Sequence, residues 1–132
     1  VIKICKALIF LMFLGGVSAE AKHLYREKEY QHFWCLANKG IEEYENTDKT
    51  RVDCLTETHA IEFDFAQKWA ESIGQALYYS KKTGKRGMVI LILENSQREI
   101  IYYQRVKELA DLYNFDAIYI TPALLTKKNE QL

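Results

Sequence analysis

Three acidic residues and a lysine lie close together in the middle of this sequence, and their types suit the binding of a divalent cation. Asp53 is followed by Glu62 and Asp64, and Lys68 comes shortly after the last acid. Carboxylate oxygens are the ligands that hard cations such as Mg²⁺ prefer. A lysine beside such a cation can orient a water molecule and stabilise charge that develops on a phosphate. The pattern therefore favours metal-dependent hydrolysis of a phosphodiester.

The segments that carry these acids have the short alternating pattern of β-strands, at residues 51–55 and 60–65. Alternation places Glu62 and Asp64 on one face of the second strand, and an antiparallel neighbour would bring Asp53 beside them. Acids that meet without an arginine on those strands repel one another, and a bound cation would remove the repulsion. The alternative is that these residues form an ordinary solvated strand face.

Residues 66–82 have the clearest helical pattern of the chain, and Gly84 is its predicted end. Lys68, Gln75 and Tyr79 lie on one line of this helix, because steps of four and seven residues return to nearly the same angle. The face predicted to pack on the sheet is a neighbouring stripe of Ala66, Trp69, Ile73, Ala76, Leu77 and Ser80. Two alternatives stay open here: Lys68 as a solvated helix lysine, and Tyr79 as a core aromatic.

The remaining elements complete an α/β pattern. They are a helix at 22–37, a strand at 41–45, a fully buried strand at 88–93, a helix that includes 102–113 and a strand at 116–120. The order is α-β-β-β-α-β-α-β, in which a helix connects an antiparallel meander to a parallel central strand. This order predicts a mixed sheet flanked by helices.

The order of elements, together with the run RVDCLTETHAIEFDFAQKWAESIGQALYY at 51–79, resembles the PD-(D/E)XK nuclease superfamily, in particular its RecB-like branch with a QxxxY motif. The resemblance covers roughly residues 40–93. It implies a restriction-endonuclease-like core, a single domain at 20–132 and a site for Mg²⁺ or Mn²⁺.

The family motif, carried onto this chain, makes Asp53 the first metal-binding acid and Glu62 the second, and both are catalytic. The usual lysine, two residues after the glutamate, is Asp64 here, which becomes a candidate third ligand. Lys68, at the start of the following helix, would then take the catalytic role of that lysine. This departure from the family pattern puts the activity itself in question.

The resemblance also implies residues that support the site. Gln75 and Tyr79 match the QxxxY motif, whose side chains support the site and contact DNA in the family. The strand at 41–45 offers a further acid near the metal. Glu43 is the candidate, and its neighbour Glu42, on the opposite face, is the alternative.

The first 19 residues have the pattern of a signal peptide. Lys3 and Lys6 make a basic start, the apolar run at 7–14 is too short to span a bilayer comfortably, and Val17-Ser18-Ala19 suits a signal peptidase. An N-terminal anchor or a buried helix is the alternative. The pattern predicts an exported protein, periplasmic or secreted, without stable membrane insertion after cleavage.

Two cysteines, Cys35 and Cys54, follow the predicted cleavage position, and an exported protein with two cysteines favours a disulfide between them. Two buried free thiols are the alternative.

The sequence as a whole predicts an exported phosphodiesterase that cuts nucleic acid. Removal of Lys3 and Lys6 leaves 16 basic against 18 acidic residues, which counts against nonspecific coating of nucleic acid but leaves room for a local basic site. The alternative is a catalytically inactive module of the same fold that binds a partner or ligand in the envelope. Asp64 in place of the lysine favours that alternative.

We expect residues 1–19 to be removed on export. N-terminal sequencing of protein recovered from the cell envelope or the medium should begin at Glu20, and recovery of the intact first segment in the membrane would contradict the prediction.

Overall fold

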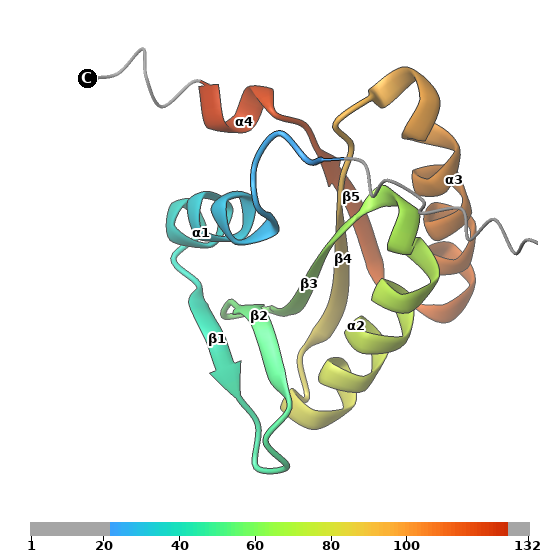
Figure 1. Ribbon diagram of the computed structural model, residues 1–132. Coiled ribbons are helices and arrows are strands. Elements are labelled where there is room, and N and C mark those ends of the chain that lie inside the picture. The colour runs from blue at the N-terminus through green and yellow to red at the C-terminus, as the bar shows by residue number, and fades with distance from the viewer. Residues whose placement is uncertain (1–21, 127–132) are drawn as a thin grey trace, which may run out of the picture.

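The computed structural model describes residues 22–126 of the 132-residue chain, so the predicted signal peptide at 1–19 lies outside the described residues. Within this range five strands form one mixed sheet in the order β1-β2-β3-β4-β5 (Figure 1). Between residues 22 and 126, no helix has both the length and the apolar character needed to cross a bilayer.

The strands are β1 (Ile41–Glu45), β2 (Arg51–Leu55), β3 (His59–Phe65), β4 (Arg86–Ile92) and β5 (Asp116–Ile120). β1, β2 and β3 pair antiparallel, whereas β3, β4 and β5 pair parallel. The predicted α/β fold with a mixed sheet flanked by helices is therefore confirmed.

The helices are α1 (Glu27–Ala37), the 3₁₀ turn η1 (Ala66–Lys68), α2 (Trp69–Thr83), α3 (Ser96–Tyr113) and the short α4 (Ala123–Thr126). Helices α1 and α4 cover one face of the sheet, and α2 and α3 cover the other (Figure 1). The sheet thus has a hydrophobic core on each side.

Strand β4 contributes buried side chains to both hydrophobic cores. Ile90 and Ile92 pack under α1, whereas Val89 and Leu91 pack under α2 and α3, and all four are fully buried. This two-sided burial is what the nearly continuous apolar run predicts for a central parallel strand.

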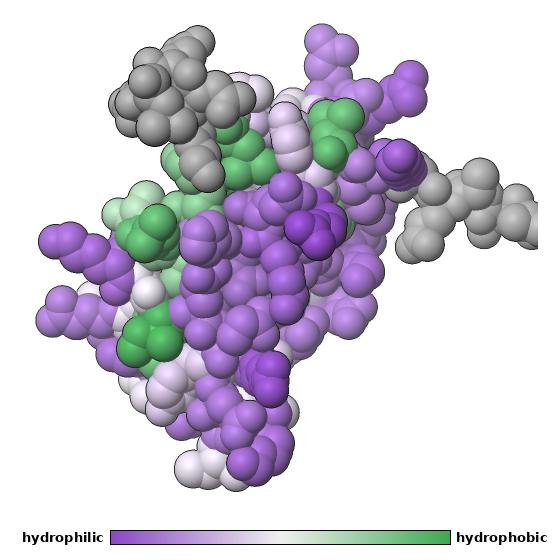
Figure 2. Space-filling view, turned by 60° about the vertical axis from the view of Figure 1, so that its left-hand side comes forward, coloured by the Kyte–Doolittle hydropathy of each residue, from purple (hydrophilic) through white to green (hydrophobic). Residues whose placement is uncertain are grey.

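The outer surface on the side of α1 and β1 is mostly hydrophilic, with apolar residues gathered in smaller patches (Figure 2). Leu36 on α1 and Ile41 on β1 are the most exposed large apolar residues of these two elements, at 68% and 59%. Small exposed apolar patches are usual on the surface of a protein in water.

The first helix begins later than its sequence pattern predicts, at Glu27 instead of residue 22. The cause is Glu94, whose carboxylate accepts hydrogen bonds from the backbone N–H groups of Leu24 at 2.9 Å and Tyr25 at 3.4 Å. The same carboxylate contacts His23 Nδ1 at 2.9 Å. These contacts hold residues 23–25 outside the helix, and they come from a residue far along the chain.

The second predicted helix, at 66–82, is divided into η1 and α2, and its packed face is rotated from the predicted one. Leu77 is 38% exposed, whereas Ser72, Ala76 and Tyr79 are buried. Gly84 ends the helix as predicted, with φ at 70°, and its N–H donates to Ser80 O at 2.9 Å. A residue with a side chain would be strained at this φ.

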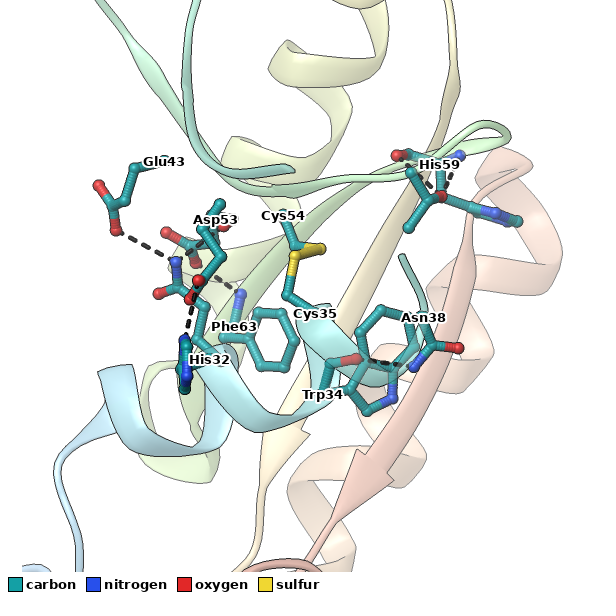
Figure 3. Close-up of a disulfide and its surroundings, with 12 residues drawn as sticks. His32, Trp34, Cys35, Asn38, Glu43, Asp53, Cys54, His59 and Phe63 are labelled. Atoms are coloured by element: carbon teal, nitrogen blue, oxygen red, sulfur yellow. Dashed lines mark hydrogen bonds and ion pairs between the residues drawn. A yellow bond between two sulfur atoms is a disulfide. The ribbon is translucent and has the colours of Figure 1, made fainter. Parts of the chain in front are cut away.

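The predicted disulfide between Cys35 and Cys54 is present, with the two Cα atoms 5.8 Å apart. It joins α1 to β2, and both cysteines are fully buried (Figure 3). Gly40 packs directly against the bond, because a Cβ there would lie 2.3 Å from Cys54 Sγ and 2.6 Å from Cys35 Sγ. Only glycine fits this position without displacing the disulfide.

We expect the double substitution Cys35→Ala/Cys54→Ala to lower the free energy of unfolding by about 3 kcal/mol, because the bond restricts the unfolded chain. Urea denaturation measures the change. The unsubstituted protein unfolded with a reducing agent is the matched control and should approach the stability of the variant. Equal urea midpoints for the variant and the oxidised protein would contradict the prediction.

Candidate functional site

The site lies where the pairing between β2 and β3 ends. Cys54 pairs with Ile61 and Leu55 with Ala60. Beyond the Cys54–Ile61 pair, the backbone N–H of Phe63 in β3 does not bond to the backbone of β2. It donates instead to the side chain of Asp53, at 2.8 Å from Oδ2. The carboxyl group of Asp53 is thereby fixed beside β3.

Glu62 and Asp64 lie on β3, opposite Val89 and Leu91 of β4. They share the face that α2 covers, because those two β4 residues pack in the core beneath α2 and α3. Only 5% of Glu62 and 4% of Asp64 is exposed. The interpretation of these acids as a solvated strand face is therefore wrong: two of the three are buried.

Burial and mutual repulsion raise the pKa values of all three acids. Burial is the largest cause for each. The pKa of Glu62 rises well above its ordinary value, with further contributions from Asp53 and Asp64. A hydrogen bond between Glu62 and Asp53 raises the pKa of Glu62 and opposes the rise at Asp53, so Glu62 holds a proton in preference to Asp53.

Asp64 has a pKa of about 7, raised first by burial and then by the charge of Glu27, and opposed by Lys68. Lys68 Nζ lies 3.8 Å from Asp64 Oδ1. The lysine side chain comes from η1 and is 59% exposed, so it reaches the acids from the solvent side. This is the placement that the sequence predicts for Lys68, although the turn that carries it is 3₁₀ instead of α-helical.

Gln75 and Tyr79 pair on α2, with Gln75 Nε2 3.4 Å from the hydroxyl of Tyr79. Tyr79 is a core aromatic that packs with Val52, Leu55 and Ala60. Its pKa is raised by burial and, more weakly, by the charges of Glu62 and Asp53. The interpretation of Tyr79 as a core aromatic is confirmed, whereas its role in supporting the site stays a prediction.

Glu43, and not Glu42, faces the acids. Glu43 Oε1 accepts a hydrogen bond from Gln31 at 3.1 Å, and its charge raises the pKa of Asp53 (Figure 3). Glu42 instead contacts His32 at 2.9 Å on the surface. Glu43 also has φ at 52°, a left-handed conformation that is strained for a residue with a side chain.

Two residues of α1 belong to this cluster and are not found by the sequence analysis. Burial and the charge of Asp53 raise the pKa of Glu27, and the charge of Glu27 in turn raises the pKa of Asp64. Gln31 is 2% exposed, and its Nε2 donates to Asp53 O at 2.7 Å as well as to Glu43. The signal available in the sequence is their spacing of one helical turn, which puts both on the same face of α1.

The hairpin that carries β2 is fastened to α2. Asp48, in the loop between β1 and β2, accepts a hydrogen bond from Tyr78 and lies 3.1 Å from Lys82 Nζ. Thr50 Oγ1 donates to the same carboxylate at 2.6 Å. These contacts position β2, and with it Asp53, relative to the helix that covers the acids.

One oxygen of the cluster lacks a partner. Among the residues that the structure describes, Glu62 Oε2 is the buried side-chain oxygen without a hydrogen bond. Within the same range, no group of three or more His, Cys, Asp or Glu residues is arranged to hold a metal. The acids influence one another's pKa values. Their oxygens nevertheless do not converge on one point.

Comparison of the chain with protein-family models, with curated proteins and with solved structures finds no match. The resemblance to the PD-(D/E)XK superfamily therefore rests on the residues of this chain alone.

We expect the protein in EDTA to lose stability as the pH rises from 5 to 7. The pKa of Asp64 is about 7 in the folded state against an ordinary value of 3.8, so the folded state binds more protons in this window and the free energy of unfolding falls with pH. Ionisation of Asp64 over this pH range should lower the free energy of unfolding by an amount on the order of 2 kcal/mol.

Urea denaturation at several pH values measures this dependence, and Asp64→Asn is the matched variant because it removes the ionisation while keeping the shape. The difference between the two proteins isolates Asp64 from the other ionisable groups, which both proteins share. Parallel curves for the two proteins would show that Asp64 has an ordinary pKa.

Proposed function

We propose that this chain is an exported phosphodiesterase that hydrolyses nucleic acid with Mg²⁺ or Mn²⁺, on a restriction-endonuclease-like core. The observation that carries the proposal is the buried Glu62 oxygen without a partner, in the middle of acids whose pKa values are raised by one another. The order of the elements supports the fold, with an antiparallel β1-β2-β3 meander followed by parallel β4 and β5.

A divalent cation fits this donor set. A buried carboxylate oxygen without a hydrogen bond is costly, and coordination to a cation removes that cost. The raised pKa values of Asp53, Glu62 and Asp64 favour bound protons, and binding of a cation to these acids would release those protons. Because the oxygens do not converge in the described structure, the side chains would turn toward a common point on binding.

Each residue then has a defined task. Asp53, Glu62 and Asp64 hold the cation, which supplies Lewis-acid polarisation of the phosphate and activation of water when bound. Lys68, beside Asp64, orients the attacking water and stabilises the charge on the phosphate. Gln31 and Glu43 hold Asp53 in position, and the bonded pair of Gln75 and Tyr79 would support the site from α2, as the QxxxY motif implies.

The exported location is supported by the buried Cys35–Cys54 bond, since disulfides form and persist in oxidising compartments.

A second candidate function is a catalytically inactive module that binds a partner or ligand in the envelope. The observation in its favour is Asp64 at the position where the family has lysine, together with the shared proton that already relieves the repulsion between Asp53 and Glu62. Metal binding separates the two candidates, because an inactive module has no need of a cation.

We expect millimolar Mn²⁺ to raise the melting temperature of the protein, since a ligand that binds only the folded state stabilises it. The increase should be larger at pH 8 than at pH 6, because protons compete with the cation for the acids. Thermal unfolding with Mn²⁺ and with EDTA measures it. An unchanged melting temperature at both pH values favours the inactive module.

We expect Asp53→Asn to abolish metal-dependent cleavage of plasmid and oligonucleotide substrates while keeping the fold, because the asparagine oxygen can still accept the hydrogen bond from Phe63 N. Lys68→Ala should slow cleavage by roughly 100-fold yet keep the stabilisation by Mn²⁺, because the lysine acts on water and phosphate. Lys107→Ala, which removes a lysine from α3, is the matched control. If Asp53→Asn cuts as fast as the parent protein, the nuclease proposal is wrong.

A further inference from the structure

A groove of about 540 Å³ adjoins the acid cluster on the side of the N-terminal segment. The residues that matter for its chemistry are Lys22, His23, Tyr25, Arg26, Glu27 and Phe65. Glu27 links the groove to the acid cluster, because it lines the groove and its charge raises the pKa of Asp64. Phe65 follows Asp64 at the end of β3, with its side chain on the opposite face, in the core under α1. A substrate bound at the acids would reach the groove past Glu27, around the end of β3.

We propose that the groove binds an unpaired nucleotide next to the phosphate that is cut, so that the substrate is single-stranded nucleic acid or the frayed end of a duplex. The proposal rests on the proposed function for the position of the phosphate, but binding in the groove can be measured separately.

The first feature that supports this inference is an aromatic platform. The ring of His23 stacks on Phe65, with the ring centroids 3.4 Å apart and the planes inclined by 6°. His23 is 36% exposed at its side chain and lines the groove, so a base could add to this stack. Bases of any sequence stack on aromatic rings, which suits a nuclease without sequence preference.

The platform is held in place before a ligand arrives. Glu94 contacts His23 Nδ1 at 2.9 Å, accepts from Leu24 N at 2.9 Å and accepts from the hydroxyl of Tyr30 at 3.0 Å. These bonds fix the segment across the end of β4. A preorganised site loses less conformational entropy on binding than a flexible segment does.

The second feature is the pair of cationic side chains at the groove, Lys22 and Arg26. Both residues are exposed, and the Arg26 side chain is 88% exposed, so each can reach a phosphate on either side of the stacked base. Glu29 is paired with Arg26 itself: its Oε2 accepts from Arg26 N at 2.8 Å and lies 3.6 Å from Arg26 Nε. This ion pair is exposed and therefore weak, so a phosphate can take the place of the Glu29 carboxylate at the guanidinium. Glu27 is directed to Asp64, whose pKa its charge raises.

Both features favour an unpaired strand. In a duplex the faces of each base are covered by its neighbours, so that stacking on a protein ring requires an unstacked base. A duplex-binding protein also relies on broad positive charge, whereas this chain without its predicted signal peptide has more acidic than basic residues. Two cationic side chains, Lys22 and Arg26, beside an aromatic stack can hold one or two nucleotides of a flexible strand.

The test is fluorescence anisotropy with a labelled short single strand, as DNA and as RNA, and with the matched duplex. All variants carry Asp53→Asn, so that cleavage does not interfere, and binding is measured in EDTA and with Ca²⁺. We expect the single strand to bind more tightly than the duplex. His23→Ala and the double variant Lys22→Ala/Arg26→Ala should each weaken binding by about 10-fold.

Two comparisons make the result specific to the groove. His23→Phe keeps a stacking ring and should retain most of the affinity that His23→Ala loses, whereas Lys107→Ala on α3 should bind as tightly as the Asp53→Asn parent. Photo-crosslinking of an iodouracil-containing strand to this parent should label His23, Tyr25 or Phe65. This second measurement does not depend on whether the groove variants fold.

Equal affinity for the duplex, groove variants that bind as tightly as the parent, or crosslinks that map to other elements would each overturn the proposal. Failure of the proposed function gives a different result, namely no cleavage and no stabilisation by Mn²⁺ in the unsubstituted protein. In that case, weaker binding by the groove variants would still support a single-strand site on a protein that does not cut.

Discussion

The hydrogen bond from the backbone of Phe63 to the carboxylate of Asp53, at 2.8 Å, stands where a β-ladder contact would otherwise continue between β2 and β3. Its consequence is that a charged side chain is held at the edge of the core, next to Glu62 and Asp64. Two of these three acids are almost fully buried. Placing like charges together in a region of low dielectric is costly, and the chain accommodates them by raising their pKa values so that protons remain bound.

The parts of the fold around the acids can be understood as restraints on this unfavourable arrangement. The disulfide ties β2 to α1 at the residue next to Asp53, and Gln31 of the same helix binds the backbone oxygen of Asp53. On the other side, Asp48 fastens the hairpin to α2. Strand β2 is therefore fixed from both faces of the sheet. Without such restraints, repulsion among the acids would move the most weakly held strand away.

Local sequence patterns predict the elements whose structure depends on neighbouring residues. The apolar run of β4, the left-handed Gly84 and the alternation in β3 each follow from residue types within a few positions. The pairing of Cys35 with Cys54 followed because only two cysteines remain after the predicted signal peptide. Elements fixed by neighbouring residues are the ones that a single sequence can predict.

The failures come from contacts between residues far apart in the sequence. Glu94 removes residues 23–25 from the first helix, and no pattern within that helix reveals its partner. The packed face of α2 turns toward Ser72 and Tyr79, because Tyr79 fills the space against Val52 and Ala60 instead of Leu77. Glu27 and Gln31 were missed for the same reason, since only the tertiary fold places α1 over the strands that carry the acids.

Glu62 is the residue on which the two candidate functions differ most. It is buried beside Asp53, and its Oε2 has no hydrogen-bond partner. A protein that had only to bury this residue could do so at lower cost with glutamine, whose amide has the same shape and carries no charge, or with an apolar side chain. The charged form of Glu62 is unfavourable here, because burial and the charges of Asp53 and Asp64 raise its pKa. A bound cation would remove that cost, and this is the physical reason for the metal-dependent function that we propose.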